Sequence, residues 1–331
     1  MKIMDCTLRD GANVVGSGFS EEMTRMITEG LIASGINIIE IGHATGLGSM
    51  KNGGKSAPVT DEGYMEAVQP YVERAEIGMF QLARNVDEEL IHLAAQKKLS
   101  FLRVGANAGD GKSAERAIKC VRDAGLAAKY SMMKAYVLTP DELAEEAALL
   151  ESYGVQAITI MDSAGFMFPT QAAEYTEKMV AAVSVPVGFH GHSNLGMAQA
   201  NAIAAARAGA GFIDCGLMGM ARSAGNITTE GIIAAFQRQG ACMEYDLYRL
   251  LTFIDDKLIP AMAAYGFHAP VTPLDLVLGW SGCHSSFLPL FREAAQEKQV
   301  DLYRLVMEVS AIDQKMPTRA LIWSTAEKLA G

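Results

Sequence analysis

Short apolar runs rich in β-branched residues alternate with longer stretches of helix-forming sequence along most of the chain. Runs of this length are typical of buried strands, and the longer stretches are typical of helices that cover them. We expect eight strands, at residues 2–4, 36–41, 76–80, 101–104, 134–138, 157–161, 185–190 and 212–215.

A helix is expected after each strand. The first begins at Ser20, whose hydroxyl suits a helix N-cap, and carries Glu21 and Glu22 in its first turn. The expected helices span 20–33, 61–71, 86–96, 113–124, 140–152, 169–183, 195–208 and 228–237. Eight strand–helix units in roughly 240 residues match an α/β fold of the closed (β/α)8 TIM-barrel type, and an open doubly wound sheet fits them less well.

The alternation of strand-like and helix-like segments ends after residue 240. Residues 245–265 and 289–330 favour helix, with no alternating strands between them. No low-complexity segment or long linker precedes this part. We therefore expect a TIM-barrel catalytic domain at 1–240 and a helical C-terminal domain at 241–331 that packs on the barrel.

Composition narrows the class of protein. The 331 residues carry a formal net charge of -10, which argues against nucleic acid and anionic membranes as partners. The five cysteines are scattered without a CxxC pair, which argues against a disulfide framework or a structural zinc site. No apolar run is long enough to cross a membrane, and the first residues lack the features of a signal peptide. We expect a soluble cytoplasmic protein.

Polar residues follow most of the predicted strands where each strand ends. The carboxyl ends of the strands carry the functional groups of TIM barrels. The residues that arrive there are Arg9, Asp10, Glu40, His43, Gln81, Asp162, Ser163, His190 and His192, followed by the glycine-rich loop 216–226.

Two of these residues suggest a metal site. His190 and His192 lie two apart on a strand and so share a face, where Asp10 could supply a third ligand. Three such ligands leave positions open for substrate, as catalytic metals require. The alternative is a pair of histidines that are hydrogen-bonded at a loop.

A divalent ion held there would act as a Lewis acid on a 2-oxo acid and stabilise the enolate formed when a carbon–carbon bond breaks. Manganese is the ion we expect first, and magnesium or cobalt would also suit these ligands. Arg9 would place a guanidinium beside the developing oxyanion. Its alternative role is a salt bridge, for example to Glu40.

Several segments resemble one family. Residues 5–11 (Asp-Cys-Thr-Leu-Arg-Asp-Gly), 190–196 (His-Gly-His-Ser-Asn-Leu-Gly) and 225–226 (Gly-Asn) resemble the metal-dependent barrel family of carbon–carbon lyases and synthases. This family includes 3-hydroxy-3-methylglutaryl-CoA lyases and 2-isopropylmalate synthases. The resemblance is closest to 4-hydroxy-2-oxovalerate aldolases and covers nearly the whole chain, including residues 39–43, 149–154, 161–165, 278–282 and 285–288.

The resemblance implies cleavage of a 4-hydroxy-2-oxo acid to pyruvate and an aldehyde. It implies that Asp10, His190 and His192 bind the metal and that Arg9 stabilises the enolate. Ser163 would lie close to the pyruvate carboxylate, and Asn226 would be a fourth ligand or a residue that supports the ligands. It also implies an acylating aldehyde dehydrogenase as a partner, bound through the C-terminal region. We also expect an oligomer.

Four positions depart from the aldolase pattern. Asn13 stands where the aldolases carry an acid–base histidine, and asparagine cannot titrate. The C-terminal motif has Trp280 and His284 where the aldolases are rich in tyrosine. His284 or His43 could then supply the base, although His43 could equally order a loop and His284 could equally be packed in the interior. Gln81, where the aldolases are apolar, suggests a more polar pocket for the aldehyde.

Three other functions are considered. Lys134, in the predicted fifth strand, could form a Schiff base and give a metal-free aldolase, but this leaves the two histidines and Arg9–Asp10 unexplained. A Claisen-type synthase that joins an acyl-CoA to a 2-oxo acid would use the same metal site. A non-catalytic barrel subunit is favoured by Asn13 and disfavoured by the intact Arg9 and Asp10.

Overall fold

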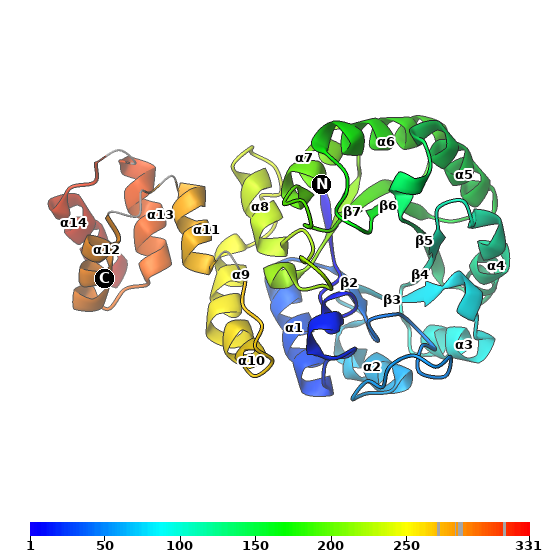
Figure 1. The fold of residues 1–331 in the computed structure, drawn as a ribbon. Coiled ribbons are helices and arrows are strands. Elements are labelled where there is room, and N and C mark those ends of the chain that lie inside the picture. Colours follow the sequence, from blue (N-terminus) through cyan, green and yellow to red (C-terminus); the bar gives the residue numbers. More distant parts are fainter. Residues whose placement is uncertain (270–271, 282, 284–286, 314–315) are drawn as a thin grey trace.

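Eight parallel strands close into a barrel in chain order, β1 to β8, and β1 completes it by pairing with β8 (Figure 1). The computed structural model describes residues 1–269, 272–281, 283, 287–313 and 316–331. The strands are β1 (Lys2–Asp5), β2 (Ile38–Ile41), β3 (Glu76–Leu82), β4 (Phe101–Asn107), β5 (Ala127–Met133), β6 (Ala157–Asp162), β7 (Val187–Gly191) and β8 (Phe212–Cys215). The predicted TIM-barrel fold is confirmed.

Eight helices surround the barrel, one after each strand (Figure 1). They are α1 (Glu21–Ala33), α2 (Asp61–Ala67), α3 (Glu88–Gln96), α4 (Glu115–Asp123), α5 (Pro140–Ser152), α6 (Pro169–Ala182), α7 (Ala198–Arg207) and α8 (Thr229–Gln237). As predicted, the Ser20 hydroxyl caps α1, accepting from the backbone N–H of Met23. Thr60 and Thr139 cap α2 and α5 in the same way.

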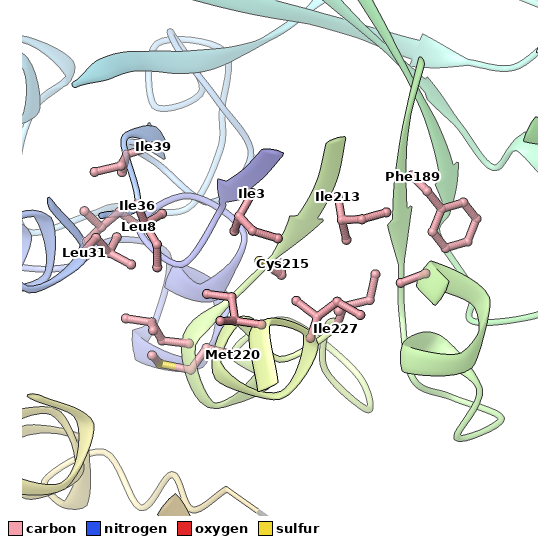
Figure 2. Packing of buried hydrophobic residues seen from close by; sticks show 14 of the residues in the cluster. Ile3, Leu8, Leu31, Ile36, Ile39, Phe189, Ile213, Cys215, Met220 and Ile227 are labelled. Atoms are coloured by element: carbon pink, nitrogen blue, oxygen red, sulfur yellow. The ribbon is translucent and has the colours of Figure 1, made fainter. Parts of the chain in front are cut away.

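The strands separate two hydrophobic cores, because alternate side chains point to opposite faces. Ile3, Ile213 and Phe189 belong to the large cluster between strands and helices, part of which is drawn in Figure 2. Met4, Phe101 and Phe212 belong to a smaller cluster, with Cys6 and Ala157. Apolar side chains from β1 and its end, β4, β6 and β8 thus pack together in this second core.

Two strand glycines allow this inner packing. Gly78 is paired with Phe101, and Gly188 with Phe212. A Cβ atom at either glycine would collide with the phenylalanine ring of the neighbouring strand. The aromatic rings therefore fill the space that the missing side chains leave.

The C-terminal region is helical, as predicted. α9 (Leu247–Phe253), a π-helical segment (Ile254–Leu258) and α10 (Ile259–Ala263) lie beside the barrel next to α1 (Figure 1). α11 (Pro273–Ser281), α12 (Leu288–Lys298), α13 (Leu302–Ile312) and α14 (Arg319–Ala330) form a group farther from the barrel axis (Figure 1). None of the helices in the described ranges is both long and apolar enough to span a membrane.

The start of this region is tied to the barrel. The Tyr245 hydroxyl accepts from the Ile3 N–H (3.0 Å), and the Asp246 N–H donates to the Ser34 carbonyl (3.0 Å). A Cβ on Gly30 of α1 would lie 2.6 Å from the Phe253 ring, so α9 packs closely on α1. The division at residue 240 stays a prediction, and these contacts favour a division farther along the chain.

The predicted fifth strand at 134–138 is wrong. The strand is β5 (Ala127–Met133), and Ala135–Val137 form a short 3-10 helix. The valine and leucine after Lys134 gave the stronger β signal, but Gly125 (φ 83°) already ends the preceding helix and the chain enters the sheet at once. Lys134 therefore lies just beyond the strand, at the barrel rim.

Candidate active site

A cavity of about 370 Å³ lies at the carboxyl ends of the strands. It contains Arg9, Asp10, Ser163, His190 and His192, all of which were predicted to meet there. The remaining lining residues are Ala44, Thr45, Phe80, Leu82, Arg84, Asn107, Met133, Lys134, Met161 and Arg222.

A tight turn after β1 places Arg9 and Asp10 at the barrel mouth. The backbone N–H groups of Arg9, Asp10 and Gly11 all donate to the Cys6 carbonyl, at 3.1, 2.8 and 3.3 Å. A short 3-10 helix (Gly11–Val15) follows. The turn reverses the chain directly at the strand end, so both charged side chains stay at the barrel mouth.

Asp10, His190 and His192 converge on one point. Oδ2 of Asp10 lies 3.6 Å from Nε2 of His190 and 3.7 Å from Nε2 of His192. The two Nε2 atoms are 3.4 Å apart. All three residues are buried. One carboxylate and two imidazole nitrogens at these separations form a donor set able to hold a divalent ion.

Charge in the cluster favours the ligating forms. Burial tends to raise the pKa of Asp10, but Arg9 and the two histidines outweigh it and hold that pKa well below its usual range. Burial and the neighbouring His190 lower the pKa of His192 to about 4. At neutral pH the aspartate is therefore ionised and His192 is neutral, as metal binding requires.

A second contact orients the His190 ring, and a backbone bridge holds His192. Nδ1 of His190 lies 3.3 Å from Oδ2 of the buried Asp214, which leaves Nε2 directed at Asp10. His192 is bridged to Asn226 in an antiparallel pair. Nδ2 of Asn226 donates to Oδ2 of Asp10 (2.9 Å), and its buried Oδ1 has no hydrogen-bond partner among the described residues.

Arg9 forms the salt bridge to Glu40 that the sequence allowed, and its role toward an enolate stays a prediction. Its Nε donates to Oε2 of Glu40 (2.6 Å), and its Nη1 lies 3.1 Å from Oδ1 of Asp10. The guanidinium carbon stands 5.0 Å from the Phe80 ring centre. Nη2 is buried with no partner in the described part of the chain, so one N–H group remains for a ligand.

Beneath Arg9 lies a buried charge network that sequence analysis missed. Arg103 is fully buried and donates from Nε and Nη2 to the two oxygens of Glu40, each at 2.6 Å. Its Nη1 donates to Asp214. Arg103 thereby joins the partner of Arg9 to the partner of His190. The available signal was an arginine inside the apolar strand Phe-Leu-Arg-Val (101–104).

Two of the predicted residues, His43 and Gln81, do not line the cavity. Nε2 of His43 lies 2.9 Å from the Lys55 carbonyl, and its Nδ1 accepts from the Thr45 N–H at 3.1 Å. Gln81 is buried and donates to the carbonyls of Leu82 and Asn85, so its side chain orders a turn and does not line the pocket. His284 lies outside the described residues.

Ser163 and Lys134 meet at the rim. The Ser163 Oγ accepts from the backbone N–H of Lys134 (2.9 Å), and both residues line the cavity. Lys134 adopts a left-handed conformation (φ 56°). Sequence analysis considered Lys134 but missed Arg84 and Arg222, which lie in loops without a recognisable motif.

Asn13 lies next to the cluster, where the aldolase histidine was expected. Its Nδ2 donates to the Asp10 carbonyl (2.8 Å). The side chain therefore supports the turn that carries Asp10 and has no proton to exchange at neutral pH.

Comparison with known proteins identifies the family of this chain. The HMGL-like family profile matches residues 1–256. The chain belongs to the HMGL-like family. A curated relative from Carboxydothermus hydrogenoformans, named 4-hydroxy-2-oxovalerate aldolase, is 34% identical over 94% of this chain and 92% of its own length. Another from Rhodococcus opacus, named 4-hydroxy-2-oxovalerate aldolase 2, is 32% identical over 99% of this chain and 94% of its own.

Solved structures agree on the fold. The hydroxymethylglutaryl-CoA lyase from Pseudomonas aeruginosa superposes with a TM-score of 0.67 at 15% identity. The match covers 84% of this chain and 97% of the lyase. The HMGL-like fold is therefore retained even where little sequence is shared.

Proposed function

We propose that this HMGL-like protein is a divalent-metal-dependent aldolase that cleaves a 4-hydroxy-2-oxo acid to pyruvate and an aldehyde. The observation that carries the proposal is the convergence of Asp10, His190 and His192 beside Arg9 in one cavity. The names of the curated relatives support the same reaction.

The donor set suits a divalent ion. An ionised carboxylate, two imidazoles and the unpartnered Oδ1 of Asn226 are ligands that Mn²⁺, Mg²⁺ or Co²⁺ accept, and we propose Mn²⁺ first. When bound, the ion supplies Lewis acidity toward the 2-oxo and carboxylate oxygens of the substrate. Asp10, His190 and His192 would hold it.

The chain's own groups account for the charge that develops. A base takes the proton of the 4-hydroxyl, the C3–C4 bond breaks, and its electron pair passes to C3 as the enolate of pyruvate. The free Nη2 group of Arg9 would donate to the enolate oxygen. Ser163 would hold the substrate carboxylate at the rim. Protonation of C3 then gives pyruvate, and C4 leaves as the aldehyde.

The general base is proposed from His43 and His284, the two histidines that sequence analysis suggested for this role. Asn13 cannot accept the proton, and both ring nitrogens of His43 contact the loop that follows β2. We therefore propose His284 as the base in place of His43. The substitution His284→Gln should lower kcat by about 10²-fold or more, and His43→Gln should act mainly on the stability of the loop. A loss of kcat of this size in His43→Gln, with kcat retained in His284→Gln, would assign the base to His43.

Two further features are proposed from the sequence. An acylating aldehyde dehydrogenase is proposed to bind through the C-terminal helices, and the protein is proposed to be an oligomer. A cytoplasmic location is supported by the buried thiols of Cys6, Cys215 and Cys242, which form no disulfide.

Release of pyruvate tests the function. The purified protein is incubated with 4-hydroxy-2-oxo acids before and after treatment with EDTA, and again after addition of Mn²⁺. The proposal predicts that EDTA abolishes pyruvate release and that Mn²⁺ restores it, whereas Asp10→Asn remains inactive. Cleavage that resists EDTA and is trapped by borohydride would instead assign the reaction to Lys134.

A further inference from the structure

Three cationic side chains line the rim of the cavity and are not used by the proposed reaction. Arg84 follows β3, Lys134 follows β5, and Arg222 lies in the loop after β8. All three are exposed. They therefore surround the mouth of the cavity above the cluster of Asp10, His190 and His192.

Within the described part of the chain, the charges at the rim have no acidic partner. Asp10 is the only acidic residue among the described residues that line the cavity, and it already pairs with Arg9. Arg9 also forms an ion pair with Glu40. No carboxylate in the described ranges lies within ion-pair distance of Arg84, Lys134 or Arg222. Like charges held around one opening repel one another, and a bound anion relieves this repulsion.

Each cation is carried by a fixed turn. The buried Gln81 donates to the Asn85 carbonyl (2.8 Å) and closes the turn that holds Arg84. Asn194 donates to the Ser223 hydroxyl (2.6 Å), beside Arg222. These hydrogen bonds fix the turns that carry Arg84 and Arg222 at the opening of the cavity. The positive charge at the rim is therefore part of the folded structure.

The backbone conformation of Lys134 supports the same conclusion. Its left-handed conformation is uncommon for a residue with a side chain and costs free energy. The Ser163 hydroxyl, which accepts from its N–H, and the Val137 N–H, which donates to its carbonyl (3.0 Å), maintain it. Strain of this kind is retained where it places a functional group.

From these observations we propose that the aldehyde half of the substrate carries a second anionic group, a carboxylate or a phosphate. This inference rests on the proposed function. The carboxylate of a 2-oxo acid supplies one negative charge, whereas three cations surround the opening. The same C3–C4 bond breaks, the hydroxyl proton goes to the base, and the second product is an aldehyde that bears the anion.

Three substrates that differ only at C5 test the inference. They carry a methyl group (4-hydroxy-2-oxopentanoate), a carboxylate (4-hydroxy-2-oxoglutarate) or a phosphorylated CH2OH group. We expect kcat/KM to be at least about ten-fold higher for one of the anionic substrates at low salt. This advantage should shrink as ionic strength rises, because the cations are exposed. The better of the two anionic substrates identifies the group.

Variants at the rim make the test specific. Each of Arg84→Met, Lys134→Met and Arg222→Met should lower the ratio of kcat/KM for the anionic substrate to that for the methyl substrate by about five-fold. Lys112→Met, an exposed lysine that does not line the cavity, is the control and should leave the ratio unchanged.

The outcomes separate the two proposals. Equal or better cleavage of the methyl substrate, with unchanged ratios in the three variants, would overturn the anionic aldehyde half and leave the aldolase intact. Failure to cleave all three substrates in the presence of Mn²⁺ would overturn the proposed function and this inference with it.

Discussion

Arg103 shows how single residues hold the candidate site together. The side chain is fully buried and bridges Glu40, which binds Arg9, and Asp214, which faces His190. Burying charge in a protein interior is costly unless each charge has a partner. Here the partners on both sides are groups that touch the cavity residues, so the network positions Arg9 and His190 together.

Replacing this arginine should therefore affect both stability and metal binding. In Arg103→Met, Glu40 and Asp214 lose their buried partner, and we expect the free energy of unfolding to fall by about 3–5 kcal/mol. In the variant that remains folded, the affinity for Mn²⁺ should fall by about 10- to 100-fold. Urea denaturation and calorimetric titration measure the two effects.

The control is an arginine at the surface. Arg116 forms an exposed ion pair with Glu88, and Arg116→Met should leave the urea midpoint and the metal affinity unchanged. Arg103→Lys keeps the charge but not the paired contacts and should fall between the two. If Arg103→Met unfolds at the same urea concentration as the wild type, the network does not hold the site.

At the scale of elements, the start of α8 fixes the loop after β8. The Glu230 carboxylate in the first turn accepts from the Met218 N–H, at 3.1 Å to each oxygen. Burial raises the pKa of Glu230 from its usual 4.5 to about 7. Because Met218 and Arg222 lie in the same loop after β8, this contact supports the loop that carries the cavity residue Arg222.

This pKa predicts a loss of stability as pH rises. Below pH 4.5 the carboxyl group is protonated in both the folded and the unfolded state. Between 4.5 and about 7 the unfolded state loses its proton first, so the unfolded state becomes favoured. Relative to Glu230→Gln, which has no proton to lose, the wild type should lose about 3 kcal/mol over this range.

Thermal or urea unfolding at pH 5 and pH 8 measures the difference between the two proteins. The substitution Glu174→Gln on the exposed side of α6 is a suitable control for the loss of one negative charge. A constant difference between wild type and Glu230→Gln at the two pH values would show that Glu230 is ionised in the folded protein across the range.

Sequence patterns predicted the elements where the apolar run is bounded by clear signals. β6, β7 and β8 were predicted within two or three residues at each end. β5 was missed because Ser131 and Met132 are buried without the β-branched side chains that mark a strand. In α9 and the segments after it, one predicted helix is interrupted by a π-helical turn, which no local pattern signals.

The site was predictable where a short motif carries the chemistry. Arg9–Asp10 were found because they directly follow the first strand, and His190–His192 because residues two apart on a strand share a face. The roles of Gln81 and His43 were not predictable in this way, because each depends on which backbone carbonyl its side chain meets after folding. Arg103, Arg84 and Arg222 were missed for the same reason: their partners, or the cavity they line, arise only in three dimensions.

At the scale of the whole molecule, the C-terminal region has two parts. α9 and α10 lie beside the barrel, whereas α12, α13 and α14 contact one another (Figure 1). α11 contacts α8 and α13 and so connects the two groups. The family match ends at residue 256, close to this division. The barrel and its first C-terminal helices therefore form one structural unit.

Two truncations test that division. A chain that ends at Gly266 keeps the contacts of Tyr245 with Ile3 and of Phe253 with Gly30, and it should unfold cooperatively. A chain that ends at Gly240 loses them and should have a lower melting temperature or fail to fold. Circular dichroism on heating compares them. Equal melting temperatures would instead support a barrel domain that ends at 240.

The central claim, that the cavity generates a pyruvate enolate with the help of a divalent ion, can be tested without an aldehyde. An enzyme that protonates the enolate also removes a C3 proton from pyruvate in the reverse direction. Exchange of the methyl protons of pyruvate in D2O is followed by proton NMR with the wild type, Asp10→Asn and Arg9→Met. Exchange that requires Mn²⁺ and is lost in both variants is the predicted result. Exchange that is absent in the Mn²⁺-loaded wild type, or unchanged in Asp10→Asn, would contradict it.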